Sequence, residues 1–378
     1  MSKSKLLIII LMLTVMLTGC YPSGGSEQPD KPAANNSTAA DSPDSGEVSE
    51  PAEFTMPNDL KNVKFSFELG DSYPTEAPVI KTKLRGFDVE EMKAMFIDGK
   101  TVIRETSNDD LNVFHTSDGE SLVVDKGRVD YRVDHLFDDE EKHNIYDIQS
   151  TAANNLRFFY IDYQYLDSEL EGFPRSEALE RAEELVKKLD IKFLGEPNIY
   201  AFTSEDIINV FGKTSFDIEG NELNNNLPKE DEFYLVRYFT EYSGIRIAEE
   251  KARVFEDVST ADPQVDIILT KDSLVRFSCD DVFDNIEAVD TTQIKYSAED
   301  IMANIYDHYR IKDSVMPVQL EYDSLDILYV TYEGDYGAGE YTLKPMWHLL
   351  GTMYNESRHS DTDKFADPVT GYVYDTGY

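Results

Sequence analysis

Residues 297–309, SAEDIMANIYDHY, decide the fold class of this chain, because they predict a helix that is followed by strands. Ser297 and Asp300 have the spacing of a capping box, in which two side chains satisfy backbone N–H groups at the helix start. Apolar side chains then mark one face of the helix: Ile301, Ile305, Tyr306 and Tyr309. Three strand-like stretches come next: 318–322, 327–332 and 341–350. This order predicts a helix packed on an antiparallel sheet.

The same order appears earlier in the chain. Ser176 is expected to cap a helix that runs to about Leu189. The apolar residues of this helix also fall on one face: 178, 179, 182, 185, 186 and 189. Four strand-like stretches follow, with turn-forming residues at 243–244 and 271–272 between them: 233–239, 245–247, 265–269 and 274–277. Because helix and strands occur twice in this order, the sequence predicts an α+β protein with two helix-plus-sheet units.

The part of the chain before these two units is expected to be rich in β-structure. Residues 63–67 alternate as a half-buried strand does, and residues 87–96 carry the apolar face of a short helix. A hairpin is expected over residues 111–124, and residues 155–165 form an aromatic, strand-like stretch. We therefore divide the folded part into a β-rich N-terminal unit and two helix-plus-sheet units: 56–165, 166–290 and 291–378.

Three stretches in the later units resemble modules of exported bacterial proteins. Residues 238–247, YFTEYSGIRI, look like a strand pair of the PepSY and YycI-like modules. Residues 343–347, LKPMW, are similar to the Leu-x-Pro-x-Trp stretch near the end of those modules. Residues 367–373, DPVTGYV, are similar to their closing Asn-Ala-x-Thr-Gly-x-Ile hairpin, with Asp-Pro in place of Asn-Ala.

This resemblance covers residues 173–378 and implies a binding or regulatory module. Related modules are thought to bind partners, to restrain peptidases or to work with membrane sensor kinases. The whole layout also resembles an uncharacterised family of Firmicute lipoproteins. The resemblance implies no catalytic constellation, and it leaves the partner open.

The first twenty residues have the layout of a lipoprotein signal peptide. Two lysines precede an uncharged stretch over residues 6–17, and LTGC at residues 17–20 resembles the bacterial lipobox. In a lipobox the cysteine is diacylated and the chain is cut just before it, so residues 1–19 are the predicted signal peptide and Cys20 the predicted lipidation site. The alternative is a transmembrane helix, but the apolar stretch is shorter than the roughly 20 residues that a bilayer requires.

Residues 20–55 are expected to form a disordered linker behind the lipidated Cys20. They are rich in Ser, Pro, Gly, Asn and acids, and such a composition cannot bury enough apolar surface to fold. Two acyl chains on one cysteine are enough for stable anchoring. The sequence therefore predicts a protein held at the extracytoplasmic face of the cell membrane.

The charge of the chain limits its partners. There are 74 Asp and Glu against 35 Lys and Arg, which gives a formal net charge of −39. A surface this negative repels phosphate backbones and anionic lipid headgroups. Nucleic-acid binding and a polybasic membrane contact are therefore excluded as main roles.

Catalytic motifs are almost absent from the sequence. Gly70-Asp71-Ser72 occurs in one esterase superfamily, but that family also needs Asp-x-x-His to activate the serine, and this chain has none. We therefore interpret the stretch as a surface turn. Cys279, the single cysteine besides Cys20, and Trp347, the single tryptophan, are expected to be core residues. No catalytic or cofactor-binding residue is predicted.

Metal sites are also not expected. The six histidines show no ligand spacing for zinc. Three acidic clusters could supply oxygen ligands for calcium: 138–141, 280–281 and 361–363. None of them matches the twelve-residue calcium-binding loop, so we interpret them as solvated charged faces.

The sequence thus favours a membrane-anchored lipoprotein that binds or regulates a protein or peptide partner, and not an enzyme. Two alternatives stay open. The first is an exported hydrolase, which a pocket joining two carboxylates, or Ser72 and a histidine, would favour. The second is a solute- or metal-binding lipoprotein.

Overall fold

The chain divides into Met1–Glu53 and one compact unit, Phe54–Tyr378. The computed structural model describes these residues: 59–70, 72–108, 111–133, 168–211, 214–216, 222–224, 227–248, 264–280, 282–313, 316–333, 340–354 and 359–374. Several predicted features lie outside them: the signal peptide 1–19, the lipidated Cys20, the linker 20–55 and the aromatic stretch 155–165. Among the described helices, none is long and apolar enough to cross a membrane.

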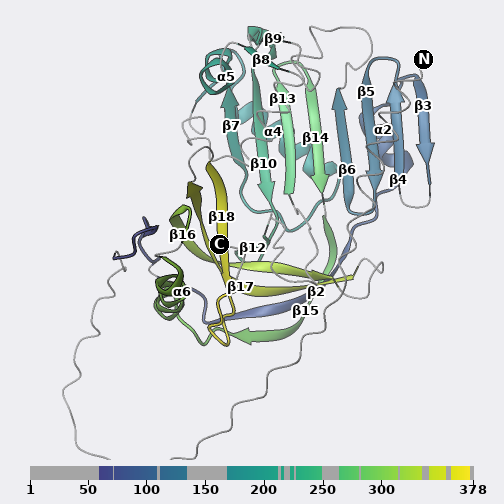
Figure 1. Ribbon diagram of the computed structural model, residues 1–378. Helices are drawn as coiled ribbons and strands as arrows, with labels where there is room; N and C mark the ends of the chain where they lie inside the picture. Colours follow the sequence, from purple (N-terminus) through teal and green to yellow (C-terminus); the bar gives the residue numbers. More distant parts are fainter. Residues whose placement is uncertain are drawn as a thin grey trace, which may run out of the picture. The chain divides into compact units, whose positions relative to one another are not determined.

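An antiparallel sheet of eight strands carries one of the two main cores (Figure 1). Its strands lie in the order β3-β4-β5-β6-β14-β13-β10-β7. Their bounds are Val102–Ser107 (β3), Leu111–Thr116 (β4), Glu120–Asp125 (β5), Arg128–Val133 (β6), Asn198–Phe202 (β7), Phe233–Phe239 (β10), Gln264–Thr270 (β13) and Leu274–Asp280 (β14). Strands β3–β6 form one antiparallel group, and β7, β10, β13 and β14 form another. The two groups join where β6 pairs with β14, with Cys279 opposite Val129.

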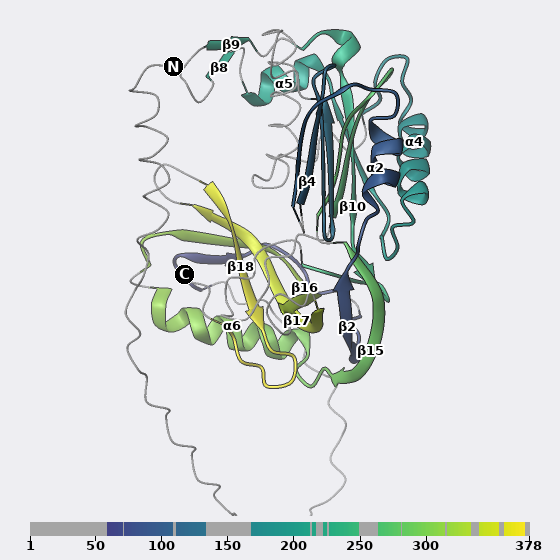
Figure 2. The ribbon, with the colours of Figure 1, turned by 90° about the vertical axis from the view of Figure 1, so that its right-hand side faces the viewer.

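Helices α2 (Val89–Phe96) and α4 (Arg175–Lys188) lie on the same face of this sheet (Figure 2). Met92 of α2 and Ala178 of α4 are buried in a shared core with strand residues such as Phe277. Cys279 is fully buried in the same core, and burial raises the pKa of its thiol. The prediction of a buried, apolar role for Cys279 is therefore confirmed.

The prediction that Ser176 caps α4 is wrong. The helix begins at Arg175, and Pro174 occupies the cap position without a side-chain hydrogen bond. The backbone N–H of Arg175 donates instead to Glu169 Oε2 at 2.8 Å. A carboxylate from the preceding turn therefore satisfies the helix start, which leaves no capping role for the serine.

A second sheet has six strands, in the order β1-β16-β17-β2-β15, and β18 also pairs with β17. The bounds are Val63–Phe65 (β1), Glu76–Leu84 (β2), Phe283–Gln293 (β15), Gln319–Glu333 (β16), Glu340–Tyr354 (β17) and His359–Ala366 (β18). β1 runs parallel to β16, whereas the other pairs are antiparallel. Trp347 of β17 is buried in the core of this sheet, as predicted.

Helix α6 (Ala298–Lys312) packs against the second sheet and starts as the sequence predicts. Ser297 Oγ accepts a hydrogen bond from the Asp300 N–H at 3.2 Å, and the Ser297 N–H donates to Asp300 Oδ2 at 3.0 Å. Ile301, Ile305 and Tyr309 are buried against the sheet. The capping box is confirmed, and so is the apolar face except at Tyr306, which is only partly buried and donates its hydroxyl to Asp59.

Several short elements complete the described fold. They are α5 (Ser204–Phe211), a 3-10 turn (Lys229–Asp231), the β8–β9 hairpin (Thr214–Phe216 and Glu222–Asn224) and the β11–β12 hairpin (Glu241–Tyr242 and Ile245–Arg246). The turn of the last hairpin has positive φ at both central residues, Ser243 and Gly244. Such φ values are typical of two-residue hairpin turns, so this predicted turn is confirmed.

The molecule is α+β with mostly antiparallel sheets, as the sequence predicts. Among the described elements, a helix precedes a run of antiparallel strands three times, and not twice as we expected: α2 before β3–β6, α4 before β7, β10, β13 and β14, and α6 before β16–β18. The two sheets do not coincide with the three units placed at 56–165, 166–290 and 291–378. Strands β1 and β2 join the sheet of β16 and β17, whereas β3 to β6 join the sheet of β10 and β14. The predicted N-terminal unit is thus shared between both sheets, because its strands pair with edges that are distant in sequence.

The stretches 318–322 and 327–332 form one strand, β16, and not the two that we expected. The register to β17 shifts between Tyr322 and Ser324, which marks a bulge. In the sequence, polar residues such as Asp323 and Ser324 separate the two stretches. In the structure the strand continues through these residues, with one extra residue at the bulge. This bulge positions the candidate site.

Candidate functional site

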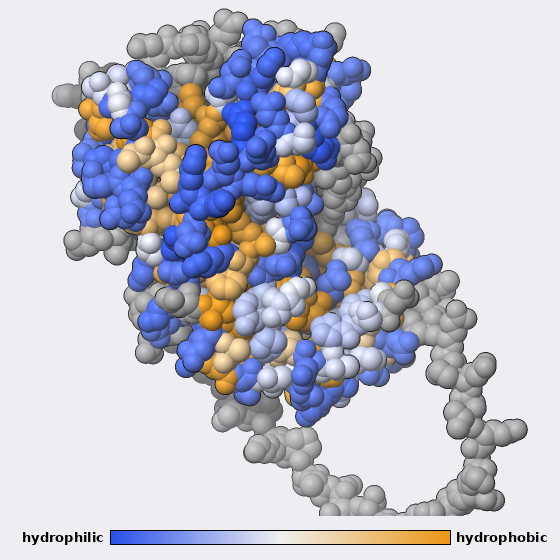
Figure 3. All heavy atoms as spheres, turned by 180° about the vertical axis from the view of Figure 1, so that it is seen from behind, coloured by the Kyte–Doolittle hydropathy of each residue, from blue (hydrophilic) through white to orange (hydrophobic). Residues whose placement is uncertain are grey.

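Large hydrophobic side chains do not mark a partner surface in the described part of the chain. The exposed ones stand singly: Ile103, Val289, Ile311 and Tyr372. Figure 3 shows one face of the molecule, on which hydrophilic and hydrophobic residues are intermingled. Apolar residues that are exposed singly are ordinary on a protein surface. The candidate site lies instead at a groove beside β16.

The bulge in β16 changes which residues face its outer edge. Before the bulge, the Leu320 N–H donates to Asn62 O and the Tyr322 O accepts from the Ser66 N–H, both at 2.8 Å. Even-numbered residues therefore bond to the β1 side. One extra residue in a strand shifts the alternation, so odd-numbered residues should face that side beyond the bulge.

Pro345 of β17 gives independent support for this shift. Pro345 lies opposite Tyr329 and has no N–H, so the two residues cannot form a hydrogen-bonded antiparallel pair. Tyr329, and with it Ile327 and Leu325, must then direct the backbone N–H and C=O groups to the outer edge. Two observed bonds agree: the Tyr73 hydroxyl donates to Leu325 O at 3.1 Å, and the Ala248 N–H donates to Tyr329 O at 2.8 Å.

The outer edge of β16 is thus paired at two places and interrupted between them. β1 pairs with it up to Tyr322, and Ile247 forms a parallel bridge with Tyr329. The six residues between these contacts span about 20 Å at roughly 3.3 Å per residue. β12 contacts β16 in this stretch, and Ile327 is buried. Several segments therefore cover the outer edge of β16 along its length: β1, Tyr73 and the stretch around Ile247.

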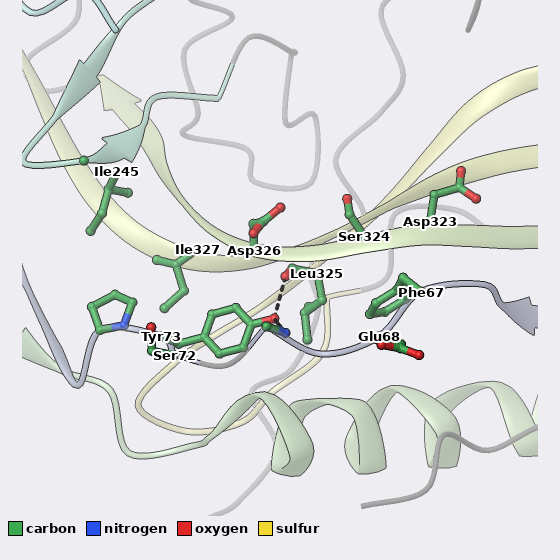
Figure 4. A pocket seen from close by; sticks show the side chains of 13 residues that line it. Phe67, Glu68, Ser72, Tyr73, Ile245, Asp323, Ser324, Leu325, Asp326 and Ile327 are labelled. Carbon is green, nitrogen blue, oxygen red and sulfur yellow. Dashed lines mark hydrogen bonds between the residues drawn. The ribbon is translucent and has the colours of Figure 1, made fainter. Parts of the chain in front are cut away.

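A groove of about 370 Å³ lies beside this part of β16 (Figure 4). Its walls come from residues 67–74, residues 244–245 and residues 323–327 of β16. The side chains of Leu325 and Ile327 point to the side of Phe67 and Tyr73, whereas Asp326 points to the opposite side. A segment lying in the groove would therefore meet an apolar side and an acidic side.

Tyr73 fixes the 67–74 wall to the core. Its hydroxyl accepts a hydrogen bond from the Gly70 N–H at 3.0 Å while it donates to Leu325 O. Its ring packs edge-on against Trp347, with 4.9 Å between the ring centroids. Trp347 is held in turn by a hydrogen bond from its Nε1 to Tyr296 O at 3.1 Å. The apolar wall is therefore part of the folded core and keeps its position.

Three carboxylates make the groove negative: those of Glu68, Asp323 and Asp326. All three side chains reach solvent. Burial and the neighbouring charge of Glu321 raise the pKa of Asp323, and Lys64 only partly offsets this effect. Lys64 itself forms an ion pair with Glu321. A cationic group in the groove would lower the energy of these carboxylates, whereas an anion would be repelled.

The predicted hydrolase features are only partly brought together. Ser72 lines the groove, but no histidine is among the described lining residues, and Asp71 lies outside the description. The groove does bring carboxylates close to one another, which was the other feature that would favour a hydrolase. The sequence interpretation missed the groove itself, since only its Gly70–Ser72 wall had drawn attention.

The acidic clusters hold no metal site that the structure describes. Asp280 pairs with Arg128 at 3.0 Å, and Asp363 lies 3.6 Å from His348. The cluster 138–141, Asp281 and the side chain of Asp361 lie outside the description. In the described ranges, no three His, Cys, Asp or Glu residues are grouped so that they could hold a metal ion.

Comparison with known proteins shows the fold and nothing more. No protein-family model matches the chain, and no curated protein matches it. Nine chains of solved structures match. One is the crystal structure of an uncharacterized protein from Eubacterium rectale ATCC 33656, with a TM-score of 0.58 and 14% sequence identity. The match covers 84% of this chain and 91% of that chain, so the two share a fold over most of their lengths.

Proposed function

We propose that this protein is a membrane-anchored extracytoplasmic lipoprotein that binds a protein or peptide partner. The groove beside β16 supports the binding role, because apolar side chains and carboxylates line it together: Phe67, Tyr73, Asp323 and Asp326. The anchor rests on LTGC at residues 17–20, where Cys20 would carry the lipid and residues 20–55 would act as the tether. The excess of acids supports a partner other than nucleic acid.

The likeness to PepSY and YycI-like modules is part of the same proposal. The order of a helix and consecutive antiparallel strands supports it, and this order recurs among the described elements. Gly371, in the closing hairpin of the resemblance, has a φ of +70° in its turn. Asn304, in the middle of α6, donates to Gly371 O at 2.9 Å, so this stretch packs against the helix. The resembling stretches therefore have structural roles in this chain.

The anchor can be tested with Cys20→Ala. Loss of the thiol removes the site of acylation, so the variant should stay unprocessed or leave the membrane, without labelled lipid. The measurement is incorporation of radiolabelled palmitate in growing cells, with Cys279→Ala as the matched control. Equal labelling of wild type and Cys20→Ala would refute the anchor.

The binding role can be tested by photo-crosslinking in intact membranes. A photoreactive amino acid at Ser324, in the groove, should give a discrete cross-linked species on irradiation. The same amino acid at Val289, an exposed position on β15, serves as the control. Identical products from both positions, or none from Ser324, would contradict a partner in the groove.

A second candidate, an exported hydrolase, is favoured by one observation. The groove holds three carboxylates, and the pKa of Asp323 is raised, as a general acid requires. If the protein hydrolyses glycosidic bonds, Asp323→Asn should abolish release of reducing ends from cell-wall glycan. Absence of any release by the wild-type protein would exclude this candidate.

A further inference from the structure

We propose that the eight-stranded sheet carries a second docking surface, on the face opposite α2 and α4, which takes an extended acidic segment of a partner protein. A stripe of basic residues crosses five neighbouring strands on this face. Each member lies directly opposite the next: Arg104 (β3), His115 (β4), Ser121 (β5), Arg132 (β6) and Arg276 (β14). The basic stripe is separate from the groove beside β16, so the inference goes beyond the function proposed above.

The strand register places the basic stripe on one face of the sheet. Residues that lie directly opposite in neighbouring strands share a face. Phe114, next to His115 in β4, is buried in the core that the sheet shares with α2 and α4. Because successive side chains of a strand alternate, the stripe lies on the other face (Figure 2). Arg104 is exposed, and the other basic members are partly exposed, so solvent reaches the stripe.

The basic stripe brings like charges together. Arg132 lies directly opposite Arg276, and Arg104 lies directly opposite the imidazole of His115. The Cβ atoms of such pairs are only about 5 Å apart, and like charges in these positions destabilise a sheet. The Nε of Arg276 is also buried, and it has no hydrogen-bond partner among the described residues. A carboxylate between the side chains would offset both effects, because it accepts paired hydrogen bonds from arginine.

The nearest described carboxylates on the same face belong to another arginine. Asp130 and Asp280 pair with Arg128, at 3.4 and 3.0 Å. Among the described residues, neither Arg104 nor Arg276 takes part in an ion pair. The face therefore satisfies its own acids beside the stripe and keeps positive charge within it.

The spacing of the strands defines the segment that fits. Neighbouring strands lie about 4.8 Å apart, so the five strands place the ends of the stripe about 19 Å apart. One basic end is Arg104 with His115, and the other is Arg132 with Arg276. The centres of these two ends are about 14 Å apart, which is about four residues of an extended chain. Two acidic residues with this separation therefore reach both ends at once.

Two spaced carboxylates fit the stripe better than a dense polyanion does. The net charge of −39 repels closely spaced phosphates. At physiological salt, however, exposed charges more than about 8 Å apart are largely screened from each other. A single carboxylate at each end of the stripe therefore interacts chiefly with the arginines that it touches.

Short peptides test the occupant with the full-length protein in detergent at physiological salt. A labelled peptide with two aspartates four residues apart among threonines should bind, as measured by fluorescence anisotropy. Two changes should each weaken binding by about tenfold or more, which is 1.4 kcal/mol. They are asparagine in place of both aspartates, and the two aspartates moved next to each other. Equal binding of either changed peptide would overturn the inference, and so would tighter binding of a polyphosphate of similar length.

Protein variants locate the binding site. The double variant Arg104→Gln and Arg276→Gln removes one arginine from each end of the stripe and should weaken binding of the aspartate peptide by about tenfold. The matched control is Lys81→Gln and Lys83→Gln, which makes the same charge change at exposed positions of β2. The control should bind within about twofold of wild type, since only the overall charge changes. Equal losses in the two variants would place the effect in the overall charge and overturn the site.

Stability distinguishes a docking residue from a structural one. Arg276→Met keeps an unbranched side chain opposite Ile268 and removes both the like charge and the buried Nε. In the absence of peptide, this variant should unfold at a urea concentration equal to or higher than that of wild type. Arg237→Met, which breaks the ion pair with Asp266, should unfold at a lower concentration. A lower midpoint for Arg276→Met would show that Arg276 stabilises the sheet and would overturn its docking role.

The peptide test and the cross-linking test at Ser324 give independent answers. If the aspartate peptide fails to bind while Ser324 still cross-links to a partner in membranes, this inference is wrong and the proposed function stands. If the peptide binds to wild type and not to the Arg104→Gln, Arg276→Gln variant while Ser324 gives no cross-link, the inference stands and the groove is not the binding site.

Discussion

Gly351 is the residue on which the bulge of β16 depends. A Cβ atom at this position would lie 2.2 Å from Glu321 O and 2.6 Å from Tyr322 Cα. Both contacts are to backbone, which cannot rotate away as a side chain could. The bulge in turn decides which backbone groups face the groove. The absence of a side chain at Gly351 on β17 therefore leaves room for the bulge in the neighbouring strand β16.

We predict that Gly351→Ala destabilises the protein by about 1–3 kcal/mol, the usual cost of forcing extra atoms into a packed site. The matched control is Gly86→Ala, where a Cβ would meet no atom within 4 Å. The control should be neutral or slightly stabilising, because alanine restricts the unfolded chain. Urea denaturation measures both. Equal stability of the two variants would show that the strand relaxes around the new methyl group.

A buried ion pair makes a second prediction at the residue scale. Arg237 on β10 donates to both carboxylate oxygens of Asp266 on β13, at 2.7 and 2.8 Å, and the two residues are 2% and 7% exposed. Arg237→Met leaves a buried carboxylate without this partner and should cost about 3–5 kcal/mol. Adding Asp266→Leu should recover much of the loss, as measured by urea denaturation. No recovery would mean that the partners act independently.

At the scale of single elements, the two long helices begin in different ways, and this difference can be measured. Ser297→Ala removes the cap of α6 and should cost about 1 kcal/mol. Ser176→Ala lies inside α4, where it makes no capping bond, and should stay within about 0.5 kcal/mol of wild type. Thermal denaturation compares the two. A larger loss from Ser176→Ala would contradict the helix start at Arg175.

Elements with local causes could be predicted from the sequence. The α6 capping box, the β4–β5 hairpin and the strand Phe233–Phe239 depend on residues close together in the chain, and all are confirmed. The pairing of β1 with β16, and of β2 with β15 and β17, joins residues about 200 or more positions apart. No periodicity encodes such a partner, because each strand edge offers the same backbone groups.

The candidate site could not be predicted for the same reason. It forms where a bulge, a proline on the neighbouring strand and two distant segments meet. Pro345 lies inside β17, between the residues that pair with β2 and those that pair with β18. The missing N–H therefore costs no ladder bond, but this is visible only once the neighbours are known.

At the scale of the whole molecule, buried tyrosines link the stability of the two cores to pH. Burial raises the pKa of Tyr131 in the core of the eight-stranded sheet, and of Tyr322 and Tyr329 in the core of the six-stranded sheet. It raises the pKa of Tyr238 to about 12. Unfolded tyrosines titrate near pH 10. The folded state therefore keeps protons that the unfolded state has already released.

We predict that stability is unaffected by these tyrosines below about pH 10 and falls above it, by up to roughly 1.4 kcal/mol per pH unit for each of them. The sign follows from the raised pKa values, since the folded state binds more protons than the unfolded state in this range. Urea midpoints at about pH 8 and pH 11 measure the loss, and tyrosinate absorbance should rise together with unfolding.

Tyr329→Phe is the variant that isolates this effect, because the Tyr329 hydroxyl is buried and has no hydrogen-bond partner among the described residues. Phenylalanine keeps the ring in the core and removes the proton that the unfolded state would release. The variant should match or exceed wild-type stability at neutral pH and should lose less on going to alkaline pH. A pH dependence identical to that of wild type would show that Tyr329 ionises as easily in the folded protein as in the unfolded chain.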